Sequence, residues 1–156
     1  MTTVIELIAK LNRQASQGLA RNIKAMPEDK VSWHPMDVGR DAIDQAIECA
    51  GIYFLAAKSL TTRENPVFDP AAFEAMKTEN DTTEKVLALL EKGTDTFVAA
   101  VEAFPPEHLD DKVTLPFGGG MEMTFADMML LAHWNTVYHV GQVTYIQTLY
   151  GDKEMH

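Results

Sequence analysis

Residues 112–151 read "KVTLPFGGGMEMTFADMMLLAHWNTVYHVGQVTYIQTLYG", and this stretch decides the fold. On both sides of the triple glycine, apolar residues alternate with other residues, which is the pattern of a small β-hairpin with a glycine turn. Thr124 and Asp127 then have the spacing of a helix cap, in which side chains bond to free backbone N–H groups. The stretch therefore predicts a hairpin followed by a long last helix that runs to about Tyr150.

Apolar residues also recur at helical spacing before this hairpin. They do so over residues 3–24, 41–60 and 82–103, and a shorter helix is expected in "DPAAFEAMK" at residues 69–77. Helices of this length with short connections are typical of bundles. We predict an all-α four-helix bundle with a small β-hairpin before the last helix, formed by one domain over residues 1–156.

The composition is that of an ordinary globular protein, with 46% hydrophobic and 23% charged residues. A formal net charge of −10 argues against nucleic acid and anionic membrane surfaces as partners, because both attract basic proteins. Cys49 is the only cysteine, the first residues do not resemble a signal peptide, and no apolar run reaches the roughly 20 residues of a membrane span. We therefore expect a cytoplasmic protein with no nucleic-acid or membrane partner.

The last helix carries a short polar row on a mainly apolar face. His139 shares this face with Asn135, one turn before it, and with Gln142, three residues after it. His133 lies about 120° away around the helix axis, because six residues separate it from His139. Two interpretations fit this row. Its members form a hydrogen-bonded cluster in the core, or they line a pocket in which His139 takes a metal ion or a proton.

A second candidate lies in the helix predicted for residues 41–60. Glu48 stands among apolar residues, and a buried carboxylate is costly unless it is paired or bound to a metal. Alternatively, Glu48 lies at the polar edge of the helix and faces water. The adjacent Cys49 is more typical of a small buried hydrophobe than of a nucleophile. The run of glycines at residues 118–120 is explained by the hairpin turn and does not predict a phosphate loop.

These segments resemble the DinB/YfiT-like four-helix bundles, which are described as metalloenzymes. "PEDKVSWHP" at residues 27–35 is similar to the family's link between its first two helices, and "GRDAIDQAIECA" at residues 39–50 resembles the start of its second helix. "LPFGGGMEMTFADMMLLAHW" at residues 115–134 fits its hairpin and last helix, and "YHVGQ" at residues 138–142 resembles its YHxGQ signature. The resemblance covers essentially the whole chain.

The resemblance implies a metal site built by three histidines, one from the second helix and two from the last. Carried over by position, His139 takes the final ligand place, while Glu48 and Asn135 stand where the other two histidines are expected. Histidine and carboxylate are good ligands for zinc, nickel or iron, whereas an asparagine amide is a weak ligand. His133 points elsewhere and cannot replace Asn135.

Two functional hypotheses follow. In the first, Glu48 and His139 bind a divalent metal, and the resemblance implies an enzyme of the thiol-dependent transferase or hydrolase type. A metal-free form of this enzyme would use a Glu48–His139 hydrogen bond as an acid–base pair. In the second hypothesis, the chain is a non-catalytic binding or structural protein that has lost the metal site, and Glu48, Asn135 and His139 form a closed polar cluster in the core. The family tendency toward dimers also implies a homodimer. Further candidates for the pocket are Gln142, Cys49, Tyr138 and His133.

Overall fold

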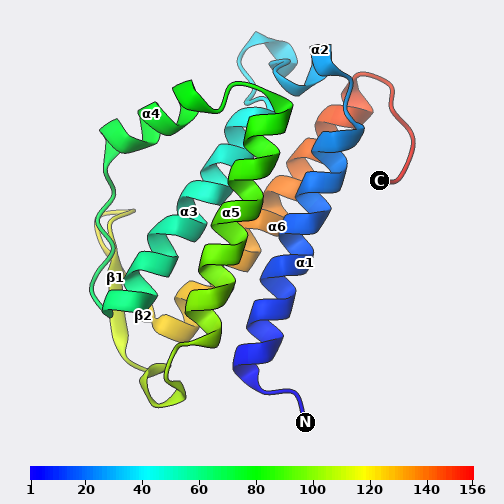
Figure 1. Cartoon of the computed structure of the whole chain (residues 1–156). Coiled ribbons are helices and arrows are strands. Elements are labelled where there is room, and N and C mark those ends of the chain that lie inside the picture. Colours follow the sequence, from blue (N-terminus) through cyan, green and yellow to red (C-terminus); the bar gives the residue numbers. More distant parts are fainter.

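The computed structural model describes all residues from 1 to 156. Its long helices form the bundle that the sequence predicts (Figure 1). They are α1 (Val4–Ala25), α3 (Ala42–Thr62), α5 (Thr83–Glu102) and α6 (Phe125–Leu149). The shorter elements are α2 (Glu28–Val31), α4 (Pro70–Glu79), β1 (Lys112–Leu115), β2 (Met121–Thr124) and single turns of 3-10 helix at Pro35–Asp37 and Pro106–His108.

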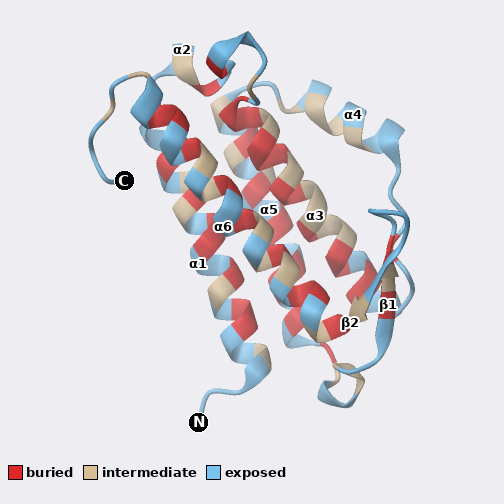
Figure 2. Ribbon diagram, turned by 180° about the vertical axis from the view of Figure 1, so that it is seen from behind, coloured by how far each residue is buried: buried red, intermediate tan, exposed pale blue.

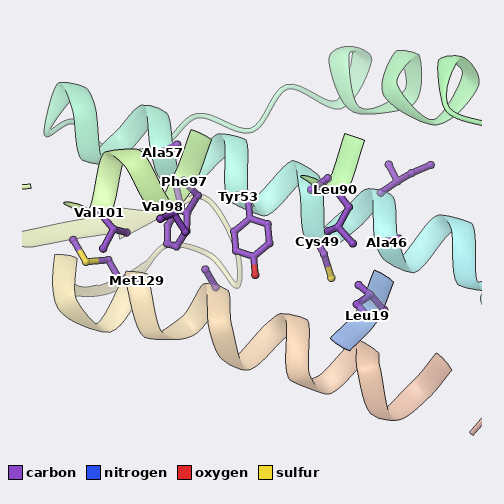
Figure 3. Packing of buried hydrophobic residues seen from close by; sticks show 14 of the residues in the cluster. Leu19, Ala46, Cys49, Tyr53, Ala57, Leu90, Phe97, Val98, Val101 and Met129 are labelled. Atoms are coloured by element: carbon purple, nitrogen blue, oxygen red, sulfur yellow. The ribbon is translucent and has the colours of Figure 1, made fainter. Parts of the chain in front are cut away.

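The long helices are arranged so that α1 and α3 each pack against both α5 and α6. Tyr53 of α3, Phe97 of α5 and Met129 of α6 have essentially no exposed surface and belong to one buried cluster inside the bundle (Figure 3). The ring centroids of Tyr53 and Phe97 lie 5.2 Å apart. Burial of such large apolar side chains is the main source of stability in a bundle of this size. No helix of the chain is long and apolar enough to cross a membrane.

The start of α6 is fixed by the cap that the sequence predicts. The Thr124 side chain accepts a bond from the Asp127 backbone N–H, and the Asp127 carboxylate accepts one from the Thr124 backbone N–H. Asp41 caps α3 in a related way, because its carboxylate accepts a bond from the backbone N–H of Asp44. These caps satisfy N–H groups that have no partner within the helix.

The hairpin precedes α6, as predicted. Its strands are antiparallel, with Leu115 opposite Met121. The turn between them needs glycine, since Gly118, Gly119 and Gly120 all have positive φ angles, a conformation that other residues adopt only with strain. Leu115 is buried and attaches the hairpin to the bundle.

Helix α4 lies outside the bundle and alongside α3 (Figures 1 and 2). It has no buried residue, and Phe73 and Met76 are the side chains with which it packs against the core. Together with the extended segment before it and the hairpin, α4 forms the outer wall of a cavity whose inner wall is made by α3 and α6. This wall creates the space in which the candidate site lies.

Candidate functional site

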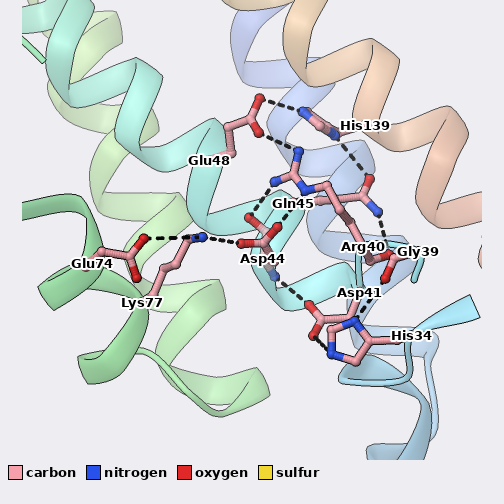
Figure 4. A network of polar contacts seen from close by, with 10 residues as sticks. All are labelled: His34, Gly39, Arg40, Asp41, Asp44, Gln45, Glu48, Glu74, Lys77 and His139. Atoms are coloured by element: carbon pink, nitrogen blue, oxygen red, sulfur yellow. Dashed lines mark hydrogen bonds and ion pairs between the residues drawn. The ribbon is translucent and has the colours of Figure 1, made fainter. Parts of the chain in front are cut away.

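Glu48 of α3 and His139 of α6 meet across the bundle (Figure 4). Oε1 of Glu48 lies 3.0 Å from Nε2 of His139, and Nδ1 of His139 lies 3.1 Å from Oε1 of Gln45. The imidazole is buried, with 2% exposure, whereas the Glu48 side chain keeps 30% of its surface exposed. Glu48 therefore lies at the edge of α3 and also points to a buried partner, which combines the two alternatives left open by the sequence.

The hydrogen bonds of His139 hold its ring in one orientation. Both ring nitrogens face oxygen atoms that can only accept a bond. The orientation of the Gln45 amide is set by its nitrogen, which donates to the backbone carbonyl of Arg40 at 3.3 Å. The imidazole is therefore held between two acceptor oxygens, one facing each ring nitrogen.

Arg40 holds the other side of the Glu48 carboxylate. Its Nη1 donates to Oε2 of Glu48 at 2.6 Å, and its Nε donates to Oδ2 of Asp44 at 2.5 Å. The hydrogen bond from His139 and, secondly, that from Arg40 lower the pKa of Glu48 below its ordinary value, although burial acts in the opposite direction. Glu48 is therefore a fixed, ionised group.

The network continues to the outer wall. Nζ of Lys77 in α4 lies 2.9 Å from Oδ1 of Asp44 (Figure 4). Arg40, Gln45 and Lys77 were missed by the sequence reasoning. Asp44 and Glu48 lie one turn apart on one side of α3, and Arg40 stands four residues before Asp44, just ahead of the Asp41 cap. This spacing could have indicated that Arg40 pairs with both carboxylates.

A cavity of about 570 Å³ lies between α3, α6, the hairpin, α4 and the segment before α4. Most of its lining is apolar, and Glu48 and Asn135 contribute polar groups from facing helices. Lys58 and Asp69 also line it, but both are exposed at its rim. A volume of this size is typical of small-molecule sites.

Asn135 lies in the cavity wall without a hydrogen bond to Glu48 or His139. Its amide nitrogen lies 3.8 Å from Sγ of Cys49, which is a weak contact. Burial raises the pKa of the Cys49 thiol to about 12, so this residue is an inert, small apolar side chain and not a nucleophile.

The other predicted pocket residues lie outside the cavity lining. Tyr138 is 52% exposed, because it precedes His139 by one residue and therefore points about 100° away from it. His133 is half-buried toward α1, where Nδ1 lies 3.2 Å from the Leu11 carbonyl oxygen. Gln142 is half-buried, and its side-chain oxygen has no hydrogen-bond partner.

The donor set does not fit a three-ligand metal centre. No group of three or more histidine, cysteine, aspartate or glutamate side chains is arranged to hold a metal ion. The Arg40 guanidinium already bonds to Glu48, and a cation at this place opposes the binding of a second cation. Only Glu48 and His139 are strong ligands, and the amide of Asn135 does not complete the set.

Comparison with known proteins gives the family and the fold. A family model described as the DinB superfamily matches residues 2–143. No curated protein matches the chain at a significant level. YfiT from Bacillus subtilis, described as a probable metal-dependent hydrolase with an unusual four-helix bundle topology, has a TM-score of 0.77 at 14% identity, covering 94% of this chain and 87% of YfiT.

Two further solved structures share the fold. A DinB-like protein from Bacillus subtilis has a TM-score of 0.72 at 18% identity, with 96% of each chain covered. A mycothiol-dependent maleylpyruvate isomerase has a TM-score of 0.70 at 14% identity. That match covers 92% of this chain but only 63% of the isomerase, so the chain spans less than two thirds of its length.

Proposed function

The chain belongs to the DinB superfamily, and we propose that it binds a small organic molecule in the cavity beside Glu48 and Asn135, without a metal ion. One observation carries this proposal. Glu48 and Asn135 face the same cavity from α3 and α6, and the remaining lining is mostly apolar. A few polar groups in an apolar cavity are typical of a site that orients a small ligand.

Glu48 is the principal anchor in this proposal. His139 and Arg40 each bond to one of its carboxylate oxygens, so the carboxylate has a fixed position before a ligand arrives. Such pre-organisation lowers the entropic cost of binding. His139 does not line the cavity, and it therefore acts as a positioning residue.

Protein-observed NMR with a library of small polar and apolar molecules tests the proposal. We expect binding compounds to shift the methyl signals of Ile52 and Leu131 and the side-chain amide signal of Asn135, all of which line the cavity. Ala72→Trp, which places a large ring in the cavity from α4, should abolish these shifts. Shifts that lie only on other surfaces, or no shifts with any compound, would contradict the proposal.

Metal-dependent transfer or hydrolysis, of the thiol-dependent type, is a second candidate. One observation favours it, because Glu48 Oε1 and His139 Nε2 are both good ligands and lie only 3.0 Å apart. The description of YfiT as a probable metal-dependent hydrolase supports the same candidate. Elemental analysis separates the two candidates.

A further inference from the structure

We propose that the ligand of this cavity has a predominantly apolar body and a single uncharged polar end, such as a hydroxyl or an amide. This inference rests on the proposed function and adds the chemical class of the ligand to it. It follows from the walls of the cavity, the space between them, and the charge balance around Glu48.

The outer wall of the cavity is aromatic. The ring centroids of Phe68 and Phe73 lie 5.7 Å apart, and those of Phe68 and Phe117 lie 5.9 Å apart. Phe68 is nevertheless 40% exposed and Phe117 is 37% exposed. Their rings therefore keep apolar surface that an apolar ligand would remove from water, and such burial favours binding roughly in proportion to its area.

The inner wall leaves room for such a body. Ala56 of α3 and Ala132 of α6 are buried and line the cavity, and their methyl groups occupy little of it. Gly51 allows the closest approach of α4, since a Cβ atom there would lie 3.2 Å from the Phe73 ring. The bundle side of the cavity therefore has small residues among larger apolar ones such as Ile52 and Leu131, and aromatic rings form its outside.

The charged side chains at the Glu48 and Asn135 end of the cavity are already paired, and the unpaired Lys58 lines the cavity ten residues further along α3, at the exposed rim. The Glu48 carboxylate is paired with His139 and Arg40, and Asp44 is paired with Arg40 and Lys77. A charged ligand group placed beside Glu48 would therefore be desolvated without a partner of its own, which is unfavourable. An uncharged hydroxyl or amide can instead bond to the Asn135 amide or share the carboxylate of Glu48.

The weak attachment of α4 gives such a ligand a route into the cavity. No residue of α4 is buried, and its contacts with α3 include the Lys77–Asp44 ion pair and the Phe73 ring against Gly51. A partly exposed ion pair of this kind contributes only modest stability. Displacement of α4 therefore breaks few contacts and exposes the cavity along its length.

A competition experiment tests the inference with three compounds that share one body. The uncharged fluorophore N-phenyl-1-naphthylamine is bound to the full-length protein and displaced by 1-decanol, decanoate or decylamine at neutral pH, each below its micelle-forming concentration. We expect decanol to displace the probe at concentrations at least about tenfold lower than the two charged compounds, because only these bring an uncompensated charge.

Two variants test whether the probe binds in the cavity. Ala72→Trp fills it from α4 and should lower the affinity for the probe at least about tenfold, whereas Ala75→Trp, on the same helix but outside the lining, should leave the affinity unchanged. Displacement by decanoate or decylamine at equal or lower concentration than by decanol overturns the inference and leaves the proposed function standing. Saturable probe binding that is equal in Ala72→Trp and in the unaltered protein overturns the inference, and the NMR survey then decides the proposed function independently.

Discussion

Nε2 of His139 lies 3.0 Å from Oε1 of Glu48, so a buried side chain of α6 fixes a carboxylate that lines the cavity from α3. This contact links α3 and α6 at one point. Because the Glu48 side chain is 30% exposed and His139 only 2% exposed, the histidine is the structural partner and the glutamate is the group that meets solvent or a ligand. The consequences for stability and for metal binding differ and can be measured separately.

Replacing His139 by alanine should lower the free energy of unfolding by about 2–4 kcal/mol, because Glu48 and Gln45 lose a hydrogen-bond partner and a space opens in the core. Urea denaturation at neutral pH measures this loss. His133→Ala is the matched control, since His133 is half-buried on the same helix with one bond to the Leu11 carbonyl oxygen. His133→Ala should lower the free energy of unfolding by about 1 kcal/mol. Equal losses in the two variants would show that the Glu48 contact adds nothing.

Elemental analysis of untagged protein purified without chelator should find less than about a tenth of an equivalent of zinc, nickel or iron, because Glu48 and His139 form an incomplete ligand set beside Arg40. Asn135→His supplies a third strong ligand one turn before His139, and we expect this variant to gain zinc. Near-stoichiometric metal in the unaltered protein that disappears in His139→Ala would instead establish the metal-dependent candidate.

The features that the sequence predicted depend on local spacing. The Thr124–Asp127 cap, the glycine turn at residues 118–120 and the helix boundaries all follow from interactions within a few residues, and the structure confirms them. The position-by-position resemblance to the DinB/YfiT-like family also predicted that Glu48 and His139 lie near one another. These predictions needed no knowledge of how α4 or the hairpin packs.

The features that the sequence missed depend on the placement of distant segments. The cavity exists because α4 and the hairpin leave space between themselves and α3 and α6. The pattern of apolar residues within one helix cannot predict how far another segment lies from it. Gln45 was not recognised as a partner of His139, because the rotation of α3 relative to α6 decides which side chains meet. For the same reason Tyr138, next to His139 in the chain, lies on the surface and outside the cavity lining.

The attachment of α4 should weaken in acid. Burial alone would raise the pKa of Asp44, but hydrogen bonds from Lys77 and Arg40 outweigh it and lower this pKa below its ordinary value. A lowered pKa contributes stability that is present above the ordinary aspartate pKa of about 4 and is lost as the pH falls below it. Asp44→Asn should therefore reduce the free energy of unfolding by up to about 1 kcal/mol at pH 6, and this difference should shrink as the pH falls below about 4, because protonation of Asp44 removes the ion pair.

Lys77→Met provides the control for this pH dependence. It removes the α4 partner of Asp44 and leaves Arg40 in place, so the difference between Asp44→Asn and its parent should shrink in the Lys77→Met background. Urea denaturation of the four proteins at pH 3 and pH 6 measures the coupling. A difference that stays constant between these pH values would contradict the ion-pair explanation.

The outward face of α6 should bind a second copy of the chain, which would fulfil the expectation of a homodimer. Trp134 is 61% exposed, Tyr145 is 64% exposed, and the Trp134 ring stacks on that of Tyr138 at 5.8 Å between centroids. Exposed aromatic residues in a row along one helix are typical of interface anchors.

Light scattering coupled to size exclusion should give twice the chain mass of 17.4 kDa for the unaltered protein and the single mass for Trp134→Glu. Val38→Glu alters a residue that is 90% exposed in the connection before α3, and it should leave the dimer intact. A monomeric unaltered protein at high micromolar concentration would refute the prediction, and a dimer that survives Trp134→Glu would place its interface elsewhere.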